Sequence, residues 1–102
     1  MSKMYYSDYV AHCMRFYTRT PKPVFATDTD RLDWESCKSV LATLDVFDIT
    51  LLTNIHKERD TLADNVYQAC KGLEVSQDYA WSLIQEFERK VAVERGLISE
   101  FK

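Results

Sequence analysis

Glycine and proline are scarce in this chain, and their scarcity limits what it can fold into. The 102 residues include two glycines, at positions 72 and 96, and two prolines, at positions 21 and 23. Hairpins and tight turns depend on these residue types, which supply the backbone angles that turns require. A chain with so few of them, of which 46% is hydrophobic and 28% charged, is typical of a helical globular protein. Its length corresponds to a single domain, residues 1–102.

Apolar residues recur at intervals of three and four along most of the chain, as they do on one face of a helix. Residues 5–18 form the first expected helix, with Tyr6, Val10, Cys13 and Tyr17 on its buried face. Residues 19–27 are expected to form a connector because proline lacks an amide hydrogen, with Phe25 anchoring it to the core. Residues 28–97 complete the helical core. The predicted fold is all-α, a compact bundle of about five helices.

Four residues that favour helix N-termini precede the later apolar repeats. Thr27, Asp45, Thr61 and Ser76 can each accept a hydrogen bond from an amide of the first helical turn. The expected buried faces are Trp34, Cys37, Leu41 and Leu44; Phe47, Leu51, Leu52 and Ile55; Leu62, Val66, Ala69 and Cys70; and Ala80, Ile84, Phe87 and Val91. Gly72 is expected to end the fourth helix in the left-handed conformation, and Gly96 to end the fifth.

The formal net charge of −3 is unevenly distributed. Residues 1–27 carry a net charge of +3, residues 28–48 carry −4, and the remainder carries −2. A protein that neutralises many phosphates normally has a clear basic face. This chain has at most a local one.

No pattern of residues indicates a metal site, a cofactor or an enzyme. Cysteines 13, 37 and 70 are far apart without a C-x-x-C pair, so we expect them to be buried and reduced. There is no glycine-rich phosphate loop, nucleophile elbow or H-E-x-x-H sequence. His56 precedes Lys57 near the end of a predicted helix, where a cation suits the helix dipole, and we interpret it as structural.

No stretch of the sequence reaches the roughly 18 to 20 consecutive apolar residues of a membrane span. The amino terminus also lacks the basic start and apolar run of a signal peptide. We therefore expect a cytoplasmic protein that does not associate with membranes.

Residues 61–96 combine a short helix, a glycine turn and a long amphipathic helix, the layout of a helix-turn-helix. The turn reads Gly72-Leu73-Glu74-Val75-Ser76. Residues 45–97 resemble the region-four helix-turn-helix of sigma factors and the RinA and ArpU type regulators of phages. The whole chain also resembles small uncharacterised prophage and mobile-element proteins of Clostridia-like bacteria. The segments behind that second resemblance are residues 6–17, 21–25, 64–67, 81–84 and 88–92, together with Trp34.

The resemblance implies a transcription regulator that binds duplex DNA, alone, as a homodimer or beside RNA polymerase. Its second helix would enter the major groove. The implied DNA contacts are Ser76, Gln77, Tyr79, Ser82 and Gln85 toward the bases, and Arg89, Lys90 and Arg95 toward phosphates. Either glutamine could bond the edge of an adenine. This chain departs from region-four helices by having Asp78, Glu86 and Glu88 where those carry basic residues, and carboxylates oppose phosphate binding.

An alternative function is a protein-binding accessory factor of a phage. The segment 28–48 is acidic, and an acidic segment can occupy a nucleic-acid groove by imitating phosphate. Such a chain would inhibit a host defence nuclease, as anti-CRISPR proteins do. The expected partner-binding residues are then Asp28, Asp30, Asp33 and Glu35.

Overall fold

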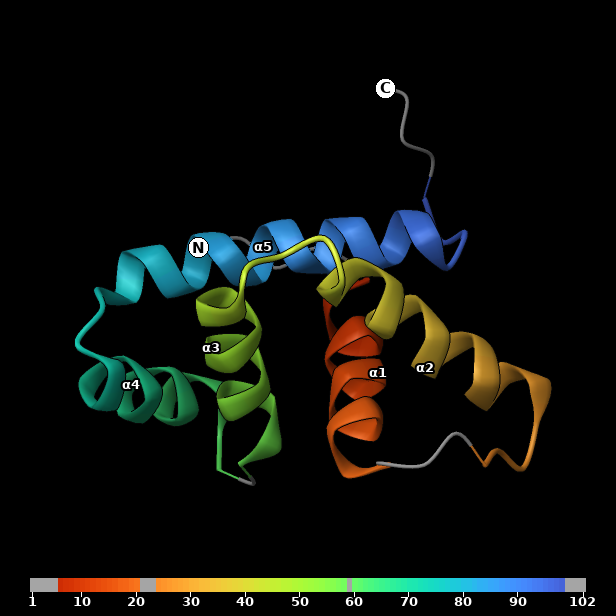
Figure 1. The fold of residues 1–102 in the computed structure, drawn as a ribbon, viewed down its shortest axis with the longest axis horizontal. Coiled ribbons are helices and arrows are strands. Elements are labelled where there is room, and N and C mark those ends of the chain that lie inside the picture. The colour runs from red at the N-terminus through yellow and green to blue at the C-terminus, as the bar shows by residue number, and fades with distance from the viewer. Residues whose placement is uncertain (1–5, 21–23, 59, 99–102) are drawn as a thin grey trace.

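The computed structural model describes residues 6–20, 24–58 and 60–98, and within these ranges it contains five α-helices and no strand (Figure 1). The helices are α1 (Ser7–Arg19), α2 (Asp28–Leu41), α3 (Val46–Lys57), α4 (Leu62–Leu73) and α5 (Gln77–Glu94). The all-α prediction and its five helices are confirmed. No helix in the described ranges has the length and apolar character needed to cross a membrane.

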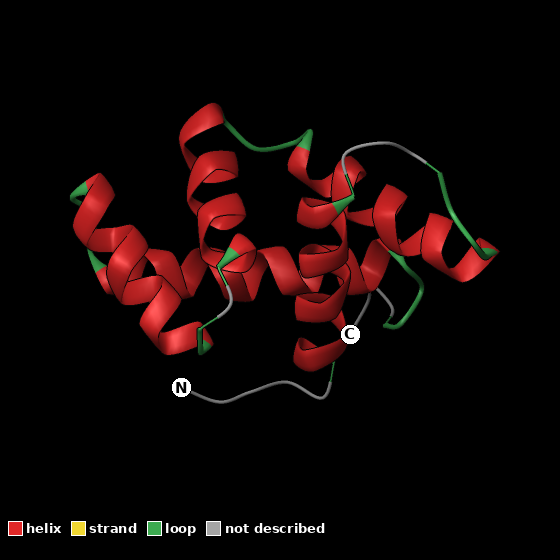
Figure 2. Cartoon of the chain, turned by 90° about the horizontal axis from the view of Figure 1, so that it is seen from below, coloured by secondary structure: helices red, strands yellow, loops and turns green. Residues whose placement is uncertain are grey.

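The long helix α5 organises the fold, since it packs against each of the other four helices. In Figure 1 it runs across the top of the molecule, with α4 below its first turns and α2 below its last turns. Figure 2 shows from below that α4 and α2 lie at opposite ends of the molecule. Helix α1 packs against both α2 and α3. The core therefore lies between α5 and the layer formed by α1, α2 and α3.

The four predicted N-caps are all present. In each, a side-chain oxygen accepts a hydrogen bond from the amide three residues later, which satisfies a donor that the helix leaves unpaired. The four oxygen–nitrogen distances are 3.1 Å for Thr27–Asp30, 2.9 Å for Asp45–Asp48, 3.2 Å for Thr61–Asp64 and 3.1 Å for Ser76–Tyr79.

The core follows the predicted faces with few exceptions. Its largest fully buried side chains include Phe87, Met14, Leu51, Leu52, Ile55 and Ile84. All three cysteines are buried and free, as predicted. One prediction is wrong: Phe47 is 41% exposed rather than part of the core. It lies in the first turn of α3, where its ring meets the partly exposed ring of Tyr79 at a centroid distance of 6.4 Å.

The end of α4 also differs from the prediction. Gly72 lies inside the helix, and Glu74 takes the left-handed conformation with φ of 56°. The amide of Val75 donates to the carbonyl of Cys70 at 3.0 Å, which closes the helix. At the end of α5 the prediction is confirmed, because Gly96 has φ of 82° and the amide of Leu97 donates to the carbonyl of Ala92 at 2.7 Å.

The connector between α1 and α2 is held by aromatic contacts. The ring of Phe25 lies 6.4 Å from that of Phe16 and 5.5 Å from that of Trp34, measured between centroids. The indole Nε1 of Trp34 donates to the carbonyl of Thr20 at 2.9 Å. The predicted anchoring role of Phe25 is confirmed, while the two prolines lie outside the described residues.

Candidate functional site

Helices α4 and α5 are joined by residues 74–76 and pack against each other. The thiol of Cys70 donates to the carbonyl of Ser76 at 3.6 Å, and Leu73 and Val75 are partly buried against the core. This arrangement fixes the start of α5 relative to α4. Whether the pair acts as a DNA-binding helix-turn-helix stays a prediction.

The residues predicted to face bases occupy different environments. Gln77, Ser82 and Gln85 are exposed on α5. Ser76 caps the helix through its hydroxyl, and the hydroxyl of Tyr79 donates to the carboxylate of Asp48 on α3. Three of the five side chains therefore present their polar groups to solvent, and the other two have partners within the protein.

The residues predicted to contact phosphate are largely engaged with carboxylates. Arg89 donates to Glu86 one turn earlier at 2.7 Å. Arg95 lies at the other end of the molecule from the turn and donates through Nε to Asp33 at 2.8 Å. Lys90 is half-buried. Since Arg89 is balanced by Glu86 and Asp78 is exposed in the first turn of α5, the exposed face of α5 offers little net positive charge.

Glu88 plays a different part from the one expected of an acidic residue on a recognition helix. It is buried, and its Oε1 accepts a hydrogen bond from the hydroxyl of Ser7 at 2.8 Å. The carboxylate therefore ties α5 to the start of α1. It does not contribute to the charge of the outer face, where Asp78 and Glu86 remain.

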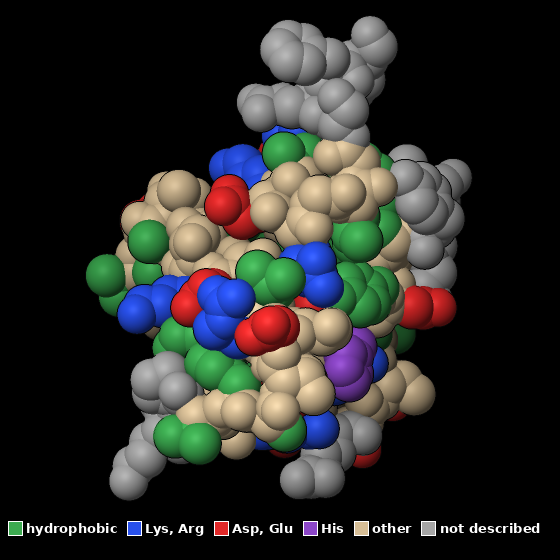
Figure 3. Space-filling model, turned by 90° about the vertical axis from the view of Figure 1, so that its right-hand side faces the viewer, with side chains coloured by type: hydrophobic (Ala, Val, Ile, Leu, Met, Phe, Trp, Pro, Cys, Tyr) green, Lys and Arg blue, Asp and Glu red, His purple; other side chains and the backbone are tan. Residues whose placement is uncertain are grey.

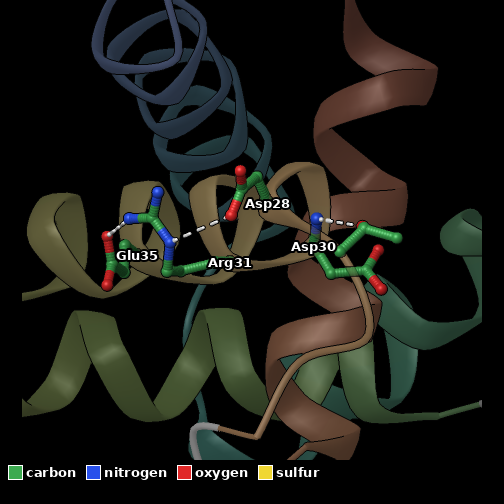
Figure 4. Close-up of polar contacts among 5 residues, drawn as sticks. Asp28, Asp30, Arg31 and Glu35 are labelled. Carbon is green, nitrogen blue, oxygen red and sulfur yellow. Dashed lines mark hydrogen bonds and ion pairs between the residues drawn. The ribbon is translucent and has the colours of Figure 1, made fainter.

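The acidic residues of α2 do not form one exposed group. Arg31 lies between Asp28 and Glu35, with nitrogen–oxygen distances of 4.0 and 3.1 Å (Figure 4). Asp30 is half-buried beside the N-cap, where its amide donates to Thr27. Asp33 is buried, and its carboxylate accepts hydrogen bonds from Tyr9 of α1 and from Arg95, which follows α5. The four carboxylates are thus divided among three environments, and one of them cannot meet a partner.

Figure 3 views the molecule from the right-hand side of Figure 1. Basic and acidic side chains alternate on this face, with hydrophobic side chains between them. No continuous basic area is visible there. The alternation agrees with the ion pairs of Arg31 and Arg89, each of which lies beside a carboxylate of its own helix.

An exposed apolar cluster lies where α3 and α5 begin. Val46 is 79% exposed, Phe47 is 41% exposed and Tyr79 is 43% exposed. Carboxylates surround the cluster: Asp45 caps α3, Asp48 accepts the hydroxyl of Tyr79, and Asp78 precedes Tyr79 on α5. We call these six residues, Val46, Phe47, Tyr79, Asp45, Asp48 and Asp78, the α3–α5 patch.

The negative charges of the α3–α5 patch affect the pKa of the Tyr79 phenol. Its hydrogen bond to Asp48 raises the pKa to about 12, with further contributions from partial burial and from the negative charges of Asp48 and Asp45. The phenol therefore stays neutral and keeps its hydrogen bond at physiological pH. Mixed aromatic and acidic surfaces of this kind favour apolar partners that also carry positive charge.

The described residues contain no group of three or more histidine, cysteine or carboxylate side chains placed to hold a metal ion. His56 is buried, and its Nδ1 lies 2.9 Å from the carbonyl of Leu52, to which it donates. Burial lowers the pKa of His56 to about 4. The structural interpretation of His56 is therefore supported, but its expected role as a cation at the helix end is wrong, because the ring is neutral at physiological pH.

Sequence reasoning missed the α3–α5 patch because it assigned Phe47 to the core. Phe47 precedes Leu51 by four residues, which is the spacing of one helical face. The available signal was the position of Val46 and Phe47 beside the Asp45 cap, in a first turn that often projects past the core.

No protein-family model, curated protein or solved structure matches this chain.

Proposed function

We propose that this protein is a binding module whose α3–α5 patch holds a segment of another protein. The observation that carries the proposal is the exposure of Val46, Phe47 and Tyr79 at one place on the surface. Tyrosine and phenylalanine are enriched in protein–protein interfaces, where they provide large contact areas at low entropic cost. Exposed apolar clusters rimmed by polar groups commonly mark such interfaces.

The charges of the patch indicate the chemistry of the partner. Asp45 and Asp78 are exposed, and Asp48 is half-buried. A partner segment with an apolar or aromatic side chain flanked by lysine or arginine would match both the cluster and its acidic rim. This partner chemistry differs from phosphate imitation by α2, for which the division of Asp28, Asp30, Asp33 and Glu35 gives little support.

DNA binding through α5 is the second candidate. It is favoured by the exposure of Gln77, Ser82 and Gln85 in the first half of α5. The paired state of Arg89 and Arg95 favours the protein-binding proposal instead. A role in phage transcription or in inhibition of a host defence nuclease stays a prediction from the resemblance.

The experiment compares two valine variants with equal change and equal exposure. Val46 and Val24 are both 79% exposed, so replacing either with lysine should leave the fold intact. Proteins captured from a lysate of the source organism by the wild type are purified, and each is titrated calorimetrically with the wild type, Val24→Lys and Val46→Lys. We expect Val46→Lys to bind the purified partner about tenfold or more weakly than the wild type does. An affinity of Val46→Lys for the partner equal to that of Val24→Lys contradicts the proposal.

A second measurement decides between protein and DNA. Fluorescence anisotropy with duplex fragments of the source genome is recorded at about 50 mM salt, where phosphate contacts are strong. The protein-binding proposal expects no selective binding. Selective binding that changes sequence preference in Gln85→Ala and weakens for all sequences in Arg89→Ala would establish α5 as a DNA reader.

A further inference from the structure

A hollow of about 490 Å³ lies where α1, α2 and α3 meet. Helix α1 packs against both α2 and α3, and in Figure 1 it lies between them. The hollow is walled by the C-terminal half of α1, the C-terminal half of α2 and two turns of α3. Its volume is in the range of small-molecule binding sites. It shares no residue with the α3–α5 patch.

The walls of the hollow are mainly apolar and are held in place. Tyr17 and Trp34 contribute adjacent rings with centroids 5.2 Å apart, and Leu41 and Ile49 complete the apolar lining. The indole nitrogen of Trp34 is already bonded to the carbonyl of Thr20, which fixes the ring. An apolar ligand would therefore meet a preformed surface, and little rearrangement would oppose its binding.

The charge at the hollow has one sign. Lys38 lines it, with Nζ 5.4 Å from the centroid of the Trp34 ring. No carboxylate is among the described side chains that line the hollow, although the whole chain is acidic. The ammonium group of Lys38 has no carboxylate partner within 4 Å among the ion pairs of the described residues. It is therefore available to an anion.

We propose that this hollow binds a small amphipathic carboxylate, with its apolar body against Tyr17, Trp34 and Ile49 and its carboxylate at Lys38. Thr20 and Thr53 also line the hollow, which adds polar residues to its wall. Charge decides the class of ligand, because an ammonium of the same shape would be repelled by Lys38. The inference is independent of the protein-binding proposal.

The test uses decanoate and decylammonium, which share an apolar chain and differ in charge. Trp34 reports binding by its fluorescence in a Trp81→Phe background, and calorimetry on the unmodified chain confirms the affinity. Both ligands are kept below their micellar concentrations. We expect decanoate to quench Trp34 saturably and to bind more tightly than decylammonium.

Two variants locate the ligand. Lys38→Met keeps the aliphatic stem and should weaken decanoate about threefold, in line with an exposed ion pair, without weakening decylammonium. Lys71→Met removes an exposed lysine of α4 and is the matched control. Ala42→Trp fills the hollow from the end of α2 and should abolish binding, while circular dichroism checks that the variant folds.

The outcomes separate clearly. Absence of saturable decanoate binding, or binding that survives Ala42→Trp, overturns the proposed site. Equal affinity for decanoate and decylammonium overturns the choice of an anion. If sedimentation shows that the wild type dimerises and Ala42→Trp does not, a second copy of the chain occupies the hollow and the small-molecule proposal is wrong.

Discussion

At the scale of single residues, one buried ion pair joins three helices. The carboxylate of Asp33 on α2 is 5% exposed and accepts hydrogen bonds from Arg95, which follows α5, and from the hydroxyl of Tyr9 on α1. The guanidinium of Arg95 also lies over the ring of Tyr9. Burial, followed by the bond to Asp33, raises the pKa of Tyr9 well above its usual value, so Tyr9 remains a donor.

Replacement of Arg95 by methionine should therefore destabilise the protein strongly. It leaves the Asp33 carboxylate buried without its cation, and a broken buried pair typically costs about 3 kcal/mol or more. Urea denaturation measures the loss. The control is Arg31→Met, which breaks exposed pairs with Asp28 and Glu35 and should cost less than about 1 kcal/mol. Equal losses in the two variants would mean that the Asp33–Arg95 pair contributes no more than a surface pair.

His56 makes stability depend on pH. Its pKa is lowered to about 4, mainly by burial. The hydrogen bond to Leu52 acts in the opposite direction and raises the pKa, and the positive charge of Arg15 lowers it further. In the unfolded chain a histidine binds its proton at a pH near 6.5, before the folded protein does. The unfolded state thus gains protons first as the pH falls, so stability is full above about pH 6.5 and decreases between about 6.5 and 4.

The variant His56→Gln should remove this component. Relative to its own value at pH 7, the wild type should lose up to about 3 kcal/mol more than the variant by pH 4. Denaturant titrations of both proteins at several pH values measure the difference, because the carboxylates titrate alike in the two chains. If the stability of the two proteins changed with pH in the same way from pH 7 to 4, the pKa of His56 would not be lowered by folding, and the folded protein would protonate it as the unfolded chain does.

At the scale of the elements, α4 and α5 are each closed by an amide that donates to the carbonyl five residues earlier, but the residues in the left-handed position differ. That residue is Gly96 after α5 and Glu74 after α4. A side chain in this conformation costs about 1 kcal/mol, whereas glycine adopts it freely. Two residues earlier, Gly72 lies within α4, and a Cβ at this position would meet no atom within 4 Å.

A glycine at position 74 and an alanine at position 72 should each stabilise the protein. Glu74→Gly relieves the left-handed side chain, and Gly72→Ala improves helix propensity, for a combined gain of about 1 to 2 kcal/mol. Thermal and urea unfolding of both single variants and the double variant measure the gain. Loss of stability in Glu74→Gly would instead assign a native contact to the Glu74 side chain.

The helix ends also show what a sequence reveals locally. Thr27, Asp45, Thr61 and Ser76 were correctly predicted as caps because a cap depends on a side chain and an amide three residues away. The end of α4 was predicted wrongly because glycine only favours the left-handed position and does not require it. The final placement depends on how Leu73 and Val75 pack against the core.

At the scale of the whole molecule, the sequence predicted the all-α fold and most of the core, but not the contacts that define the surfaces. Asp33 and Arg95 are 62 residues apart, and Asp48 and Tyr79 are 31 apart. Such pairs depend on how α5 crosses α2 and α3, which no local spacing encodes. The same crossing exposes Phe47, and the packing of α2 and α3 on α1 creates the hollow beside Lys38.

The arrangement of the helices also predicts how the molecule opens. Helix α4 packs mainly against α3 and α5, whereas α1 packs against α2, α3 and α5. One side chain holds the start of α4: the amide of Asn65 is buried and donates to the carbonyls of Ile55, Glu58 and Asp60 at 2.9, 3.2 and 3.3 Å. Without the Asn65 side chain, these three carbonyls lose this hydrogen-bond donor.

Asn65→Ala should therefore loosen α4 before the rest of the protein. The unsatisfied carbonyls cost about 1 to 3 kcal/mol, and the loss should appear as faster amide hydrogen exchange in α4 than in α1. Asn54→Ala, at an exposed position of α3, is the control and should leave both helices unchanged. If α4 and α1 lost protection equally in Asn65→Ala, α4 would open only with the whole domain. In that case the α4–α5 pair would be part of the single cooperative core.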